Sequence, residues 1–396
     1  MTLDELAFLL SPEGQKWLAA AAVIPITPQN HLQIASQLRQ NLLPQQAQAV
    51  LETVLLRQLG TVKFSRAAEM YFVREALEQA SSESVAAHRA QRFFAAGFEH
   101  IADLGCGIGG DALALAAQAH VIGVELDSVR LAMAQENVRV YGRAAHFRPL
   151  QSDLLELSPL PVQACFFDPA RRDEYGRRLF SVHDYQPPLS LIDRWRGKMM
   201  GTAVKVSPGV NYAELPEDAE IELISLNGDV KGAVLWFGDL HSGVNRRATL
   251  LPDGSTLTNA DLPSAPIPTS EPLKYLYEPD KAIIRAHLVE ALAYQLDACK
   301  LSDDIAYLTS ATAQATPFAR CFAIEDSFPF QLKRLRHYLR QHDIGQVTVK
   351  KRGSPLEPDA LRHQLRLKGS QHRIIFLTQV KGETAVLIGH EINHEQ

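Results

Sequence analysis

The sequence predicts an α/β protein with an open, mostly parallel sheet at its centre, a helical segment before the sheet and an α+β segment after it. Three observations carry this prediction. A strand, a glycine turn, a helix and a second strand follow one another over residues 101–127. Apolar runs typical of strands then alternate with helical patterns up to residue 237, and a cationic mixture of both patterns fills the C-terminal part.

The 396 residues suggest two or three domains. We expect a helical module at 1–63, a sheet domain at 64–251, a linker at 252–272 and an α+β domain at 273–396. The linker is expected because that stretch is rich in Pro, Ser, Thr and Asp. Hydrophobic residues make up 46% of the chain and charged residues 21%, which is ordinary for a protein that buries its cores.

The first segment shows helical periodicity. Leucines at positions 3, 6, 9 and 10 have helical spacing, and a later apolar run ends at Gly60, where a glycine can end a helix. We assign no chemistry to this module. Residues 64–98 continue the helical pattern with a break at Ser81-Ser82, where a serine can cap the next helix. Because this stretch runs into the glycine turn, its polar side chains are candidates for contacting a ligand there. These candidates are Arg74, Glu78, Gln79 and Ser81.

The glycine turn is the strongest local signal. It reads D-L-G-C-G-I-G-G from Asp103, with Gly105, Gly107 and Gly109 alternating through it. Glycine permits positive φ and lets the backbone approach a ligand closely. Glu125 closes the second strand, at the strand end where open α/β sheets bind ligands, so its carboxylate can accept two ribose hydroxyls.

Two cofactors fit this pattern. Gly105, Gly107 and Gly110 spell the dinucleotide fingerprint G-x-G-x-x-G, which on its own is a weak signal for NAD. Asp103 argues against a pyrophosphate, because like charges repel in a low-dielectric cleft. S-adenosylmethionine carries an ammonium and a sulfonium, which an acid attracts, so we favour it. The glycine run together with Glu125 resembles the motif of class I methyltransferases, which implies their Rossmann-like seven-stranded sheet.

The strand and helix alternation continues after Glu125. Residues 128–141 have a helical pattern, and a strand at 146–150 is followed by Ser152 and Asp153, an acid well placed for the adenine amino group. The resemblance then implies a set of cofactor-binding residues: Asp103, Gly105, Gly107, Gly109, Glu125, Leu126, Ser152, Asp153 and Asp168, with Gln79 and Ser81 from the preceding helices.

Residues 164–169 form an apolar strand that ends abruptly in Asp168-Pro169, where proline removes an N–H and fixes the bend. This resembles the catalytic D-P-P-Y type motif of amino-methylating enzymes, in which the acid and the following carbonyl hold the target amine. The sequence departs from the motif at Ala170 and Arg171. We expect Asp168, Pro169 and Arg171 to be catalytic, with Arg171 or its neighbour Arg172 pairing with a phosphate or a guanine edge.

The rest of the sheet is predicted by two further patterns. Gly201 to Gly209 fits a fifth strand, and two β-like runs flank Asn227-Gly228, a dipeptide that favours a hairpin. A hairpin after five parallel strands matches the seven-stranded methyltransferase sheet. The turn after the fifth strand has no cysteine nucleophile, and Cys165 is expected in the core, which disfavours methylation of a pyrimidine C5.

The C-terminal segment has an α+β order. A helical pattern spans 282–299, and a later strand ends in V-T-V-K-K-R-G at 347–353. This order resembles the THUMP-like domain of bacterial class I methyltransferases, and because true THUMP domains bind RNA, the resemblance implies an RNA substrate. The expected RNA-binding residues lie on one helix face and at the end of the strand: Lys333, Arg336, Arg340, Lys350, Lys351 and Arg352.

Charge supports this expectation. The net charge is −5, but residues 331–373 hold eleven Lys or Arg against three Asp or Glu, so this stretch is +8 and the remainder −13. Four scattered cysteines argue against disulfides and a metal site and suit a reducing cytoplasm, where we expect the protein. No signal peptide is expected, because the N-terminus has no basic region before an apolar run. No membrane span is expected, because the chain has no 18-residue apolar run. The oligomeric state stays open.

These patterns favour an S-adenosylmethionine-dependent RNA methyltransferase that acts on a purine nitrogen in tRNA or rRNA by direct in-line transfer. Two alternatives remain open at this point. The first is a methyltransferase of a small molecule or protein, and the second is a non-catalytic RNA-binding protein that retains the cofactor fold.

Overall fold

The computed structural model describes residues 1–23, 25–170, 177, 179 and 181–392. The chain forms two compact units that interleave along the sequence. The first holds Met1–Ile221 and Lys231–Gly243, and the second holds Glu222–Val230 and Val244–Gln396. The division therefore falls inside a hairpin and at residue 243, and it differs from the boundary expected at 252–272.

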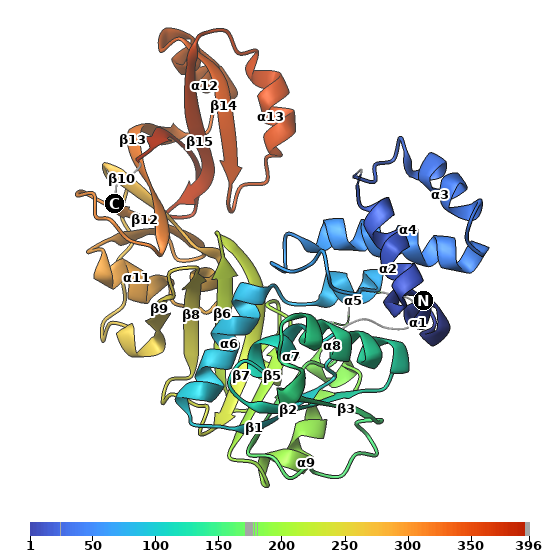
Figure 1. Cartoon of the computed structure of the whole chain (residues 1–396). Coiled ribbons are helices and arrows are strands. Elements are labelled where there is room, and N and C mark those ends of the chain that lie inside the picture. Colours follow the sequence, from blue (N-terminus) through green and yellow to red (C-terminus); the bar gives the residue numbers. More distant parts are fainter. Residues whose placement is uncertain (24, 171–176, 178, 180, 393–396) are drawn as a thin grey trace. The chain divides into compact units, whose positions relative to one another are not determined.

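The N-terminal module consists of four helices, drawn in blue in Figure 1. They are α1 (Leu3–Leu10), α2 (Pro12–Ala21), α3 (His31–Arg39) and α4 (Pro44–Gly60). Thr2 caps α1 through a capping box with Glu5, and Pro44 is the first residue of α4. Leu6 and Leu9 are buried, whereas Leu3 is exposed. The helical expectation for this segment is confirmed, and Gly60 ends α4 as predicted.

The central sheet has the strand order β3-β2-β1-β4-β5-β7-β6, continued by β8 and β9. Strands β1 (His100–Leu104), β2 (His120–Glu125), β3 (Phe147–Gln151), β4 (Ala164–Phe167) and β5 (Gly201–Val206) are parallel. β7 (Asp229–Gly238) lies antiparallel to β5, and β6 (Glu220–Leu226) precedes it across Asn227-Gly228, both of which have positive φ. This is the predicted class I arrangement.

Four helices accompany the first strands. They are α5 (Arg74–Gln79), α6 (Glu83–Ala95), α7 (Gly110–Leu115) and α8 (Ser128–Val140). α6 contacts α7, and α7 contacts α8, so these three form a row beside the sheet (Figure 1). The short helices of this region are η1 (Ala144–His146), η2 (Val182–Asp184), η3 (Leu189–Ile192), α9 (Asp193–Arg196) and η4 (Tyr212–Glu214). The helix expected from residue 64 begins only at Arg74, because turns occupy the preceding residues.

Asn137 joins the N-terminal segments to the glycine turn. Its side-chain nitrogen donates to the carbonyls of Tyr71 (3.0 Å) and Ile108 (2.9 Å), and its oxygen accepts from the Tyr71 N–H at 2.8 Å. The Tyr71 hydroxyl in turn accepts from the Gln15 side chain in α2 at 2.7 Å. Asn137 is fully buried, so its three hydrogen bonds satisfy backbone groups that water cannot reach.

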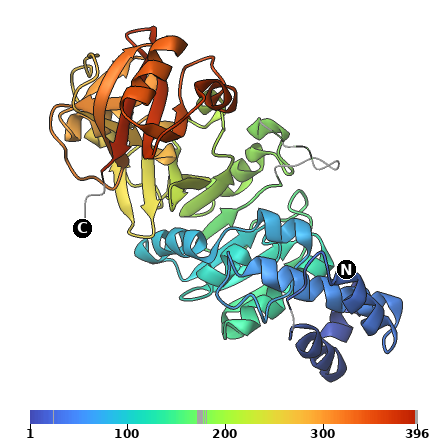
Figure 2. The same cartoon turned by 90° about the horizontal axis from the view of Figure 1, so that it is seen from above.

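The second unit contains a seven-stranded sheet in the order β11-β12-β10-β13-β16-β15-β14. Figure 2 draws most of this part of the chain in orange and red. Its strands are β10 (Tyr275–Pro279), β11 (Cys299–Ser302), β12 (Ile305–Ser310), β13 (Ala319–Pro329), β14 (Ile344–Lys351), β15 (Gln371–Val380) and β16 (Glu383–Glu391). Its helices are α10 (Lys281–Arg285), α11 (Val289–Gln295), α12 (Leu332–Gln341) and α13 (Pro358–Leu365). The single helix expected at 282–299 is therefore two short helices followed by a strand.

The expected linker at 252–272 is partly regular structure. β8 (Arg246–Leu251) pairs antiparallel with β9 (Ser255–Thr258), and η5 (Asn259–Asp261) follows. The turn-forming residues marked this stretch as irregular, but Ser255 to Thr258 gains backbone partners from β8, a pairing that composition does not reveal.

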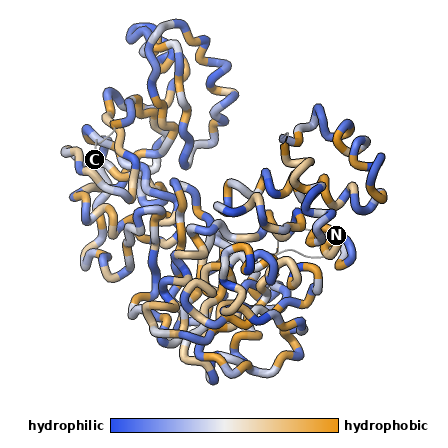
Figure 3. The backbone as a smooth tube through the Cα atoms, viewed as in Figure 1, coloured by the Kyte–Doolittle hydropathy of each residue, from blue (hydrophilic) through white to orange (hydrophobic). Residues whose placement is uncertain are grey.

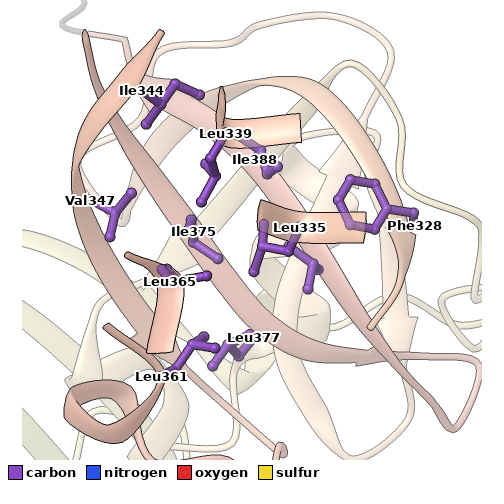
Figure 4. Close-up of a cluster of buried hydrophobic side chains, with 11 residues drawn as sticks. Phe328, Leu335, Leu339, Ile344, Val347, Leu361, Leu365, Ile375, Leu377 and Ile388 are labelled. Atoms are coloured by element: carbon purple, nitrogen blue, oxygen red, sulfur yellow. The ribbon is translucent and has the colours of Figure 1, made fainter. Parts of the chain in front are cut away.

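The helices α12 and α13 pack on the same core. Leu335 and Leu339 from α12 meet Leu361 and Leu365 from α13 over β14, β15 and β16 (Figure 4). Figure 3 shows the pattern along the chain, with hydrophobic residues alternating with hydrophilic ones along the helices. Leucines spaced by four residues place one face of each helix on the core and leave the other face for polar side chains.

Candidate active site

The glycine turn joins the end of β1 to the start of α7 and is fixed to the end of β2. The N–H groups of Gly105 and Cys106 both donate to the Val124 carbonyl, at 2.9 and 3.0 Å. Gly105, Gly107 and Gly109 all have positive φ. A Cβ on Gly105 would lie 2.9 Å from the Asp168 carbonyl, whereas a Cβ on Gly107 would meet nothing within 4 Å. The open space at Gly107 is where a ligand can approach the main chain.

Asp103 is a buried carboxylate without a partner. It is 1% exposed, and neither of its oxygens accepts a hydrogen bond from the described residues. Burial raises the pKa of Asp103 well above its usual value, and the neighbouring carboxylates of Asp111 and Asp168 raise it further, against the opposing charges of Lys205 and Arg89. A buried carboxylate of this kind fits a cationic ligand group, such as the ammonium of S-adenosylmethionine.

Glu125 is held by three main-chain donors at the end of β2. Its Oε2 accepts from Gly107 N–H at 2.9 Å, and its Oε1 accepts from Leu126 and Asp127 N–H at 2.9 and 3.0 Å. A carboxylate has about four acceptor positions, so this one retains capacity for a ribose hydroxyl. The structure therefore brings Glu125 and Gly107 together, as the cofactor prediction requires.

The strand end next to Glu125 carries Ser152 and Asp153. Ser152 N–H donates to the Glu125 carbonyl at 3.2 Å, and Asp153 Oδ1 accepts from Leu155 N–H at 2.8 Å. Leu126, directly after β2, and Leu155, four residues after β3, are 63% and 53% exposed. Apolar side chains in this place fit the faces of an adenine ring. Leu155 was not predicted as a site residue, because no local sequence pattern indicates that a leucine is exposed.

Asp168 follows β4 directly beside the glycine turn, and its N–H donates to the Leu104 carbonyl at 3.1 Å. Its Oδ2 forms an ion pair with Lys205 Nζ at 2.5 Å. The pairing register explains this contact: Phe167 lies opposite Val204, so the next residues along the two parallel strands are Asp168 and Lys205. Lys205 was not predicted as a site residue from the sequence, although a lysine inside the apolar strand G-T-A-V-K-V was a signal that could have indicated it.

The segment after α5 also lies beside the glycine turn. A Cβ on Gly110 would be 3.6 Å from Ala80 Cβ and 3.9 Å from the Ser81 carbonyl. The side chain of Gln79 instead donates to Glu75 at 3.2 Å. The structure thus brings Ser81 close to the turn and ties the Gln79 side chain to a neighbour in its own helix.

The structure describes only some of the other residues that are predicted to contact the target. Pro169 is buried, and the backbone of Ala170 pairs with that of Gln186. Arg171 and Arg172 lie outside the described residues. Tyr185, also buried, accepts from Ser207 N–H at 3.1 Å through its hydroxyl, so the segments after β4 and β5 are joined.

Three family models match parts of the chain. Residues 2–60 match a domain of unknown function, residues 98–182 match a model described as RNA cap guanine-N2 methyltransferase, and residues 319–391 match a model described as THUMP domain-like. Two curated relatives, from Mycobacterium tuberculosis strains CDC 1551 / Oshkosh and ATCC 25618 / H37Rv, are uncharacterized S-adenosylmethionine-dependent methyltransferases. Each is 35% identical over 344 residues, covering 84% of this chain and 92% of the relative.

The chain belongs to the S-adenosylmethionine-dependent methyltransferases. A solved structure of a protein from Porphyromonas gingivalis W83, assigned as a methyltransferase, has the same fold. It is 20% identical, with a TM-score of 0.76, and the match covers 93% of this chain and 100% of that one. The methyltransferase therefore combines a class I cofactor fold with a C-terminal THUMP-like domain, as the sequence predicted.

The predicted RNA-binding cations of this methyltransferase fall into two groups. At the end of β14, Lys350 forms an ion pair with Glu278, Lys351 pairs with Glu357 at 2.5 Å, and Arg352 lies over the Tyr307 ring. On α12, Lys333 and Arg340 are exposed and make no ion pair within the described part of the chain. The strand-end charges are thus largely neutralised within the domain, which the sequence did not indicate.

α12, α13 and the residues that follow α13 carry six exposed cations. Arg336 on α12 donates to the Gln364 carbonyl on α13 at 2.8 Å, which fixes the helices side by side. We call the exposed cations of these helices and of the residues that follow α13 the helical cation layer: Lys333, Arg334, Arg340, Arg362, Arg366 and Lys368. Within this layer Arg362 forms an ion pair with Asp359, and Arg334 lies over the Phe328 ring. Among the described residues, no group of three or more His, Cys, Asp or Glu could hold a metal ion, and no helix is long and apolar enough to cross a membrane.

Proposed function

We propose that this methyltransferase transfers the methyl group of S-adenosylmethionine to an amino nitrogen of a purine in tRNA or rRNA. The observation that carries the proposal is the Asp168 carboxylate beside the glycine turn. Its Oδ2 is held by Lys205, while its Oδ1 accepts no hydrogen bond from the described residues. An anchored carboxylate with one unengaged oxygen suits an amine that must donate a hydrogen bond and be held in place.

The cofactor would be held by residues at three neighbouring strand ends. Asp103 would face the ammonium, Gly107 would leave room for the methionine chain, and Glu125 would accept a ribose hydroxyl. Leu126, Ser152 and Asp153 would surround the adenine. When bound, the cofactor supplies an electrophilic methyl group on its sulfonium.

Asp168 would act by positioning rather than as a strong base. Methyl transfer is an in-line displacement, so most of its acceleration comes from holding the nucleophile within near-attack distance. Asp168 accepts a hydrogen bond from the amine and stabilises the positive charge that grows on nitrogen. The N–H of Asp168 on the Leu104 carbonyl keeps this carboxylate at a fixed distance from the turn.

An RNA substrate is supported by two independent features. The match of residues 98–182 is to a model described as RNA cap guanine-N2 methyltransferase, which concerns an exocyclic amine of a purine. The THUMP-like domain carries the helical cation layer, which suits a phosphate backbone because such contacts give affinity without reading sequence. A small-molecule or protein substrate would leave that layer without a partner.

Asp168→Ala tests the proposal. We expect the turnover to fall by at least about a hundredfold, because positioning and polarising groups commonly contribute this much, while cofactor affinity stays nearly unchanged. The assay incubates the enzyme with labelled cofactor and RNA from cells that lack the protein, then identifies the modified nucleoside by mass spectrometry. A label found only in protein or small molecules would overturn the RNA assignment, and a normal single-turnover rate would remove Asp168 from the reaction.

A further inference from the structure

Two lysines surround the turn that ends α5. Lys63 Nζ donates to the carbonyls of Leu77, Glu78 and Ala80, at 2.7, 2.9 and 2.8 Å. Lys205 Nζ donates to the intervening Gln79 carbonyl at 3.4 Å. The last carbonyls of a helix lack partners within it, and lysines satisfy them well. Four successive carbonyls are thus held by two ammonium groups from different parts of the chain.

Lys205 has a second attachment. The same ammonium group pairs with Asp168 Oδ2 at 2.5 Å, and the Lys205 side chain is 3% exposed. Stability alone is a weak explanation for a buried ion pair, because desolvation offsets most of the Coulomb attraction. The contact does, however, join the acid after β4 to the segment that leads to Ser81 beside the glycine turn.

We propose that Lys205 is a positioning residue for methyl transfer, which holds the Asp168 carboxylate and the Gln79 main chain in a fixed relation. The inference rests on the proposed function, in which Asp168 holds the target amine. Lys205 itself touches neither the target nor the methyl group. Its ammonium has three donors, two of which are used in this arrangement, so the carboxylate is fixed on one oxygen and available on the other.

A double-mutant cycle tests this role. The variants are Lys205→Met and Lys205→Arg, each made in the wild-type and the Asp168→Asn background, with Lys198→Met as the control. Lys198 is an exposed lysine three residues before β5, at the opposite end of that strand from Lys205. Single-turnover rates at saturating cofactor and RNA are compared with cofactor affinities from calorimetry.

Lys205→Met should lower the single-turnover rate by about thirtyfold or more, since small losses of positioning have large effects on rate. Cofactor affinity should stay within about threefold, and Lys205→Arg should recover part of the rate because it keeps the charge. In the Asp168→Asn background, Lys205→Met should change the rate by less than about threefold, because residues that act as one unit are not additive. An equal loss in both backgrounds would overturn the proposal and leave Lys205 as a packing residue.

Lys63 gives a readout that needs no substrate. Burial, together with the nearby charge of Lys205, lowers the pKa of Lys63 to about 8. Competitive labelling with acetic anhydride measures this pKa, which should rise in Lys205→Met and stay constant in Lys198→Met. If Lys205→Met does not fold by circular dichroism, Lys205→Gln replaces it, because it removes the charge and keeps a donor.

The two readouts separate the possible failures. An unchanged Lys63 pKa would overturn the arrangement of the two lysines. A shifted Lys63 pKa in an enzyme that methylates no RNA would overturn the proposed function, and the role of Lys205 would fall with it.

Discussion

Asp103 and Glu125 are carboxylates on neighbouring strands, and their surroundings give them different tasks. Glu125 accepts hydrogen bonds from three main-chain N–H groups, which fix its orientation, whereas Asp103 is buried with no hydrogen-bond partner among the described residues. A fixed carboxylate suits hydroxyl groups, and a bare buried one suits a positive charge. This difference predicts that cofactor affinity depends on the ionisation of Asp103.

Cofactor affinity should rise with pH until Asp103 is ionised. The pKa of Asp103 is raised by burial and by the carboxylates of Asp111 and Asp168, so in the free protein Asp103 keeps its proton to a higher pH than an exposed aspartate does. The folded free protein therefore gains stability from Asp103 below the usual pKa of an aspartate and loses it as the pH rises through the raised pKa. An arriving ammonium favours the charged form, so binding should release a proton.

Calorimetry in buffers of different ionisation enthalpy measures this proton release. Asp103→Asn should weaken binding and remove the rise of affinity at acid pH, which we call the acid limb of the curve of affinity against pH. The change of affinity near pH 8, which belongs to the amino group of the ligand, should remain. An acid limb that persists in Asp103→Asn would show that another group titrates.

Gly107→Asp should abolish cofactor binding while the protein remains folded. Gly107 has φ 53°, a value that aspartate tolerates better than most residues, and its Cβ would meet no protein atom within 4 Å. The new carboxylate would instead fill the space of the ligand, beside Glu125. We expect an affinity loss of at least about a hundredfold, or about 2.7 kcal/mol. Calorimetry measures it, thermal unfolding controls for folding, and unchanged affinity would contradict the cofactor assignment.

At the scale of single residues, the sequence revealed the acids and glycines because their motif is local. It missed Lys205, whose partner Asp168 lies 37 positions away, and it gave no sign that Glu278, 72 positions away, pairs with Lys350. These pairings depend on strand register and tertiary packing. Such information is absent from any single stretch of sequence.

At the scale of elements, helices and turns that depend on local sequence were predicted, and elements that depend on pairing with distant segments were not. The Asn227-Gly228 hairpin, the end of α4 at Gly60 and the basic helix α12 were all predicted. The strand at Ser255 to Thr258 was missed because it exists through its pairing with β8. Likewise, the predicted helix at 64–98 begins late, since its first residues form turns whose hydrogen bonds reach other segments.

The helical cation layer and the end of β14 should differ in their effect on RNA binding. Lys333→Met with Arg340→Met should weaken binding and reduce the slope of log affinity against log salt by about 2, because each cation that no longer neutralises a phosphate lowers the slope by about one unit. Lys350→Met with Lys351→Met is the matched control. Its effect should be smaller, because Glu278 and Glu357 already neutralise those charges.

Binding titrations at several salt concentrations measure both variants, and cofactor affinity serves as the internal reference. A greater weakening by the strand-end pair than by the helix pair would contradict the assignment of the helical cation layer as the RNA surface.

At the scale of the whole molecule, the two units cannot be separated by one cut. Glu222–Val230 belongs to the second unit although Lys231–Gly243 returns to the first. Within the second unit, Lys281 pairs with Asp229 at 2.6 Å, Ser225 donates to Asp280 at 3.0 Å, and Thr249 donates to Glu222 at 2.6 Å. A fragment that starts after the expected linker boundary can form none of these three interactions.

A fragment of residues 252–396 should therefore lack a cooperative thermal transition, whereas a fragment of residues 219–396 should show one. The longer fragment restores β6 and β8, together with β7, which neighbours β6 in the sheet. Circular dichroism melting and calorimetry compare the two. Equal cooperativity in both would place the boundary at 252–272, as composition alone suggested.

The interleaved chain also sets an order of events on the ribosome. Glu222–Val230 leaves the exit tunnel before its hydrogen-bonding partners at 249–281 have emerged. The first unit can close once residue 243 has emerged, but the hairpin tip must wait for about 40 more residues, on the order of 2–8 s at ordinary rates of synthesis. During that interval a strand segment is available to wrong partners. The pace of translation across residues 244–281 therefore becomes part of what determines the yield of correctly folded enzyme.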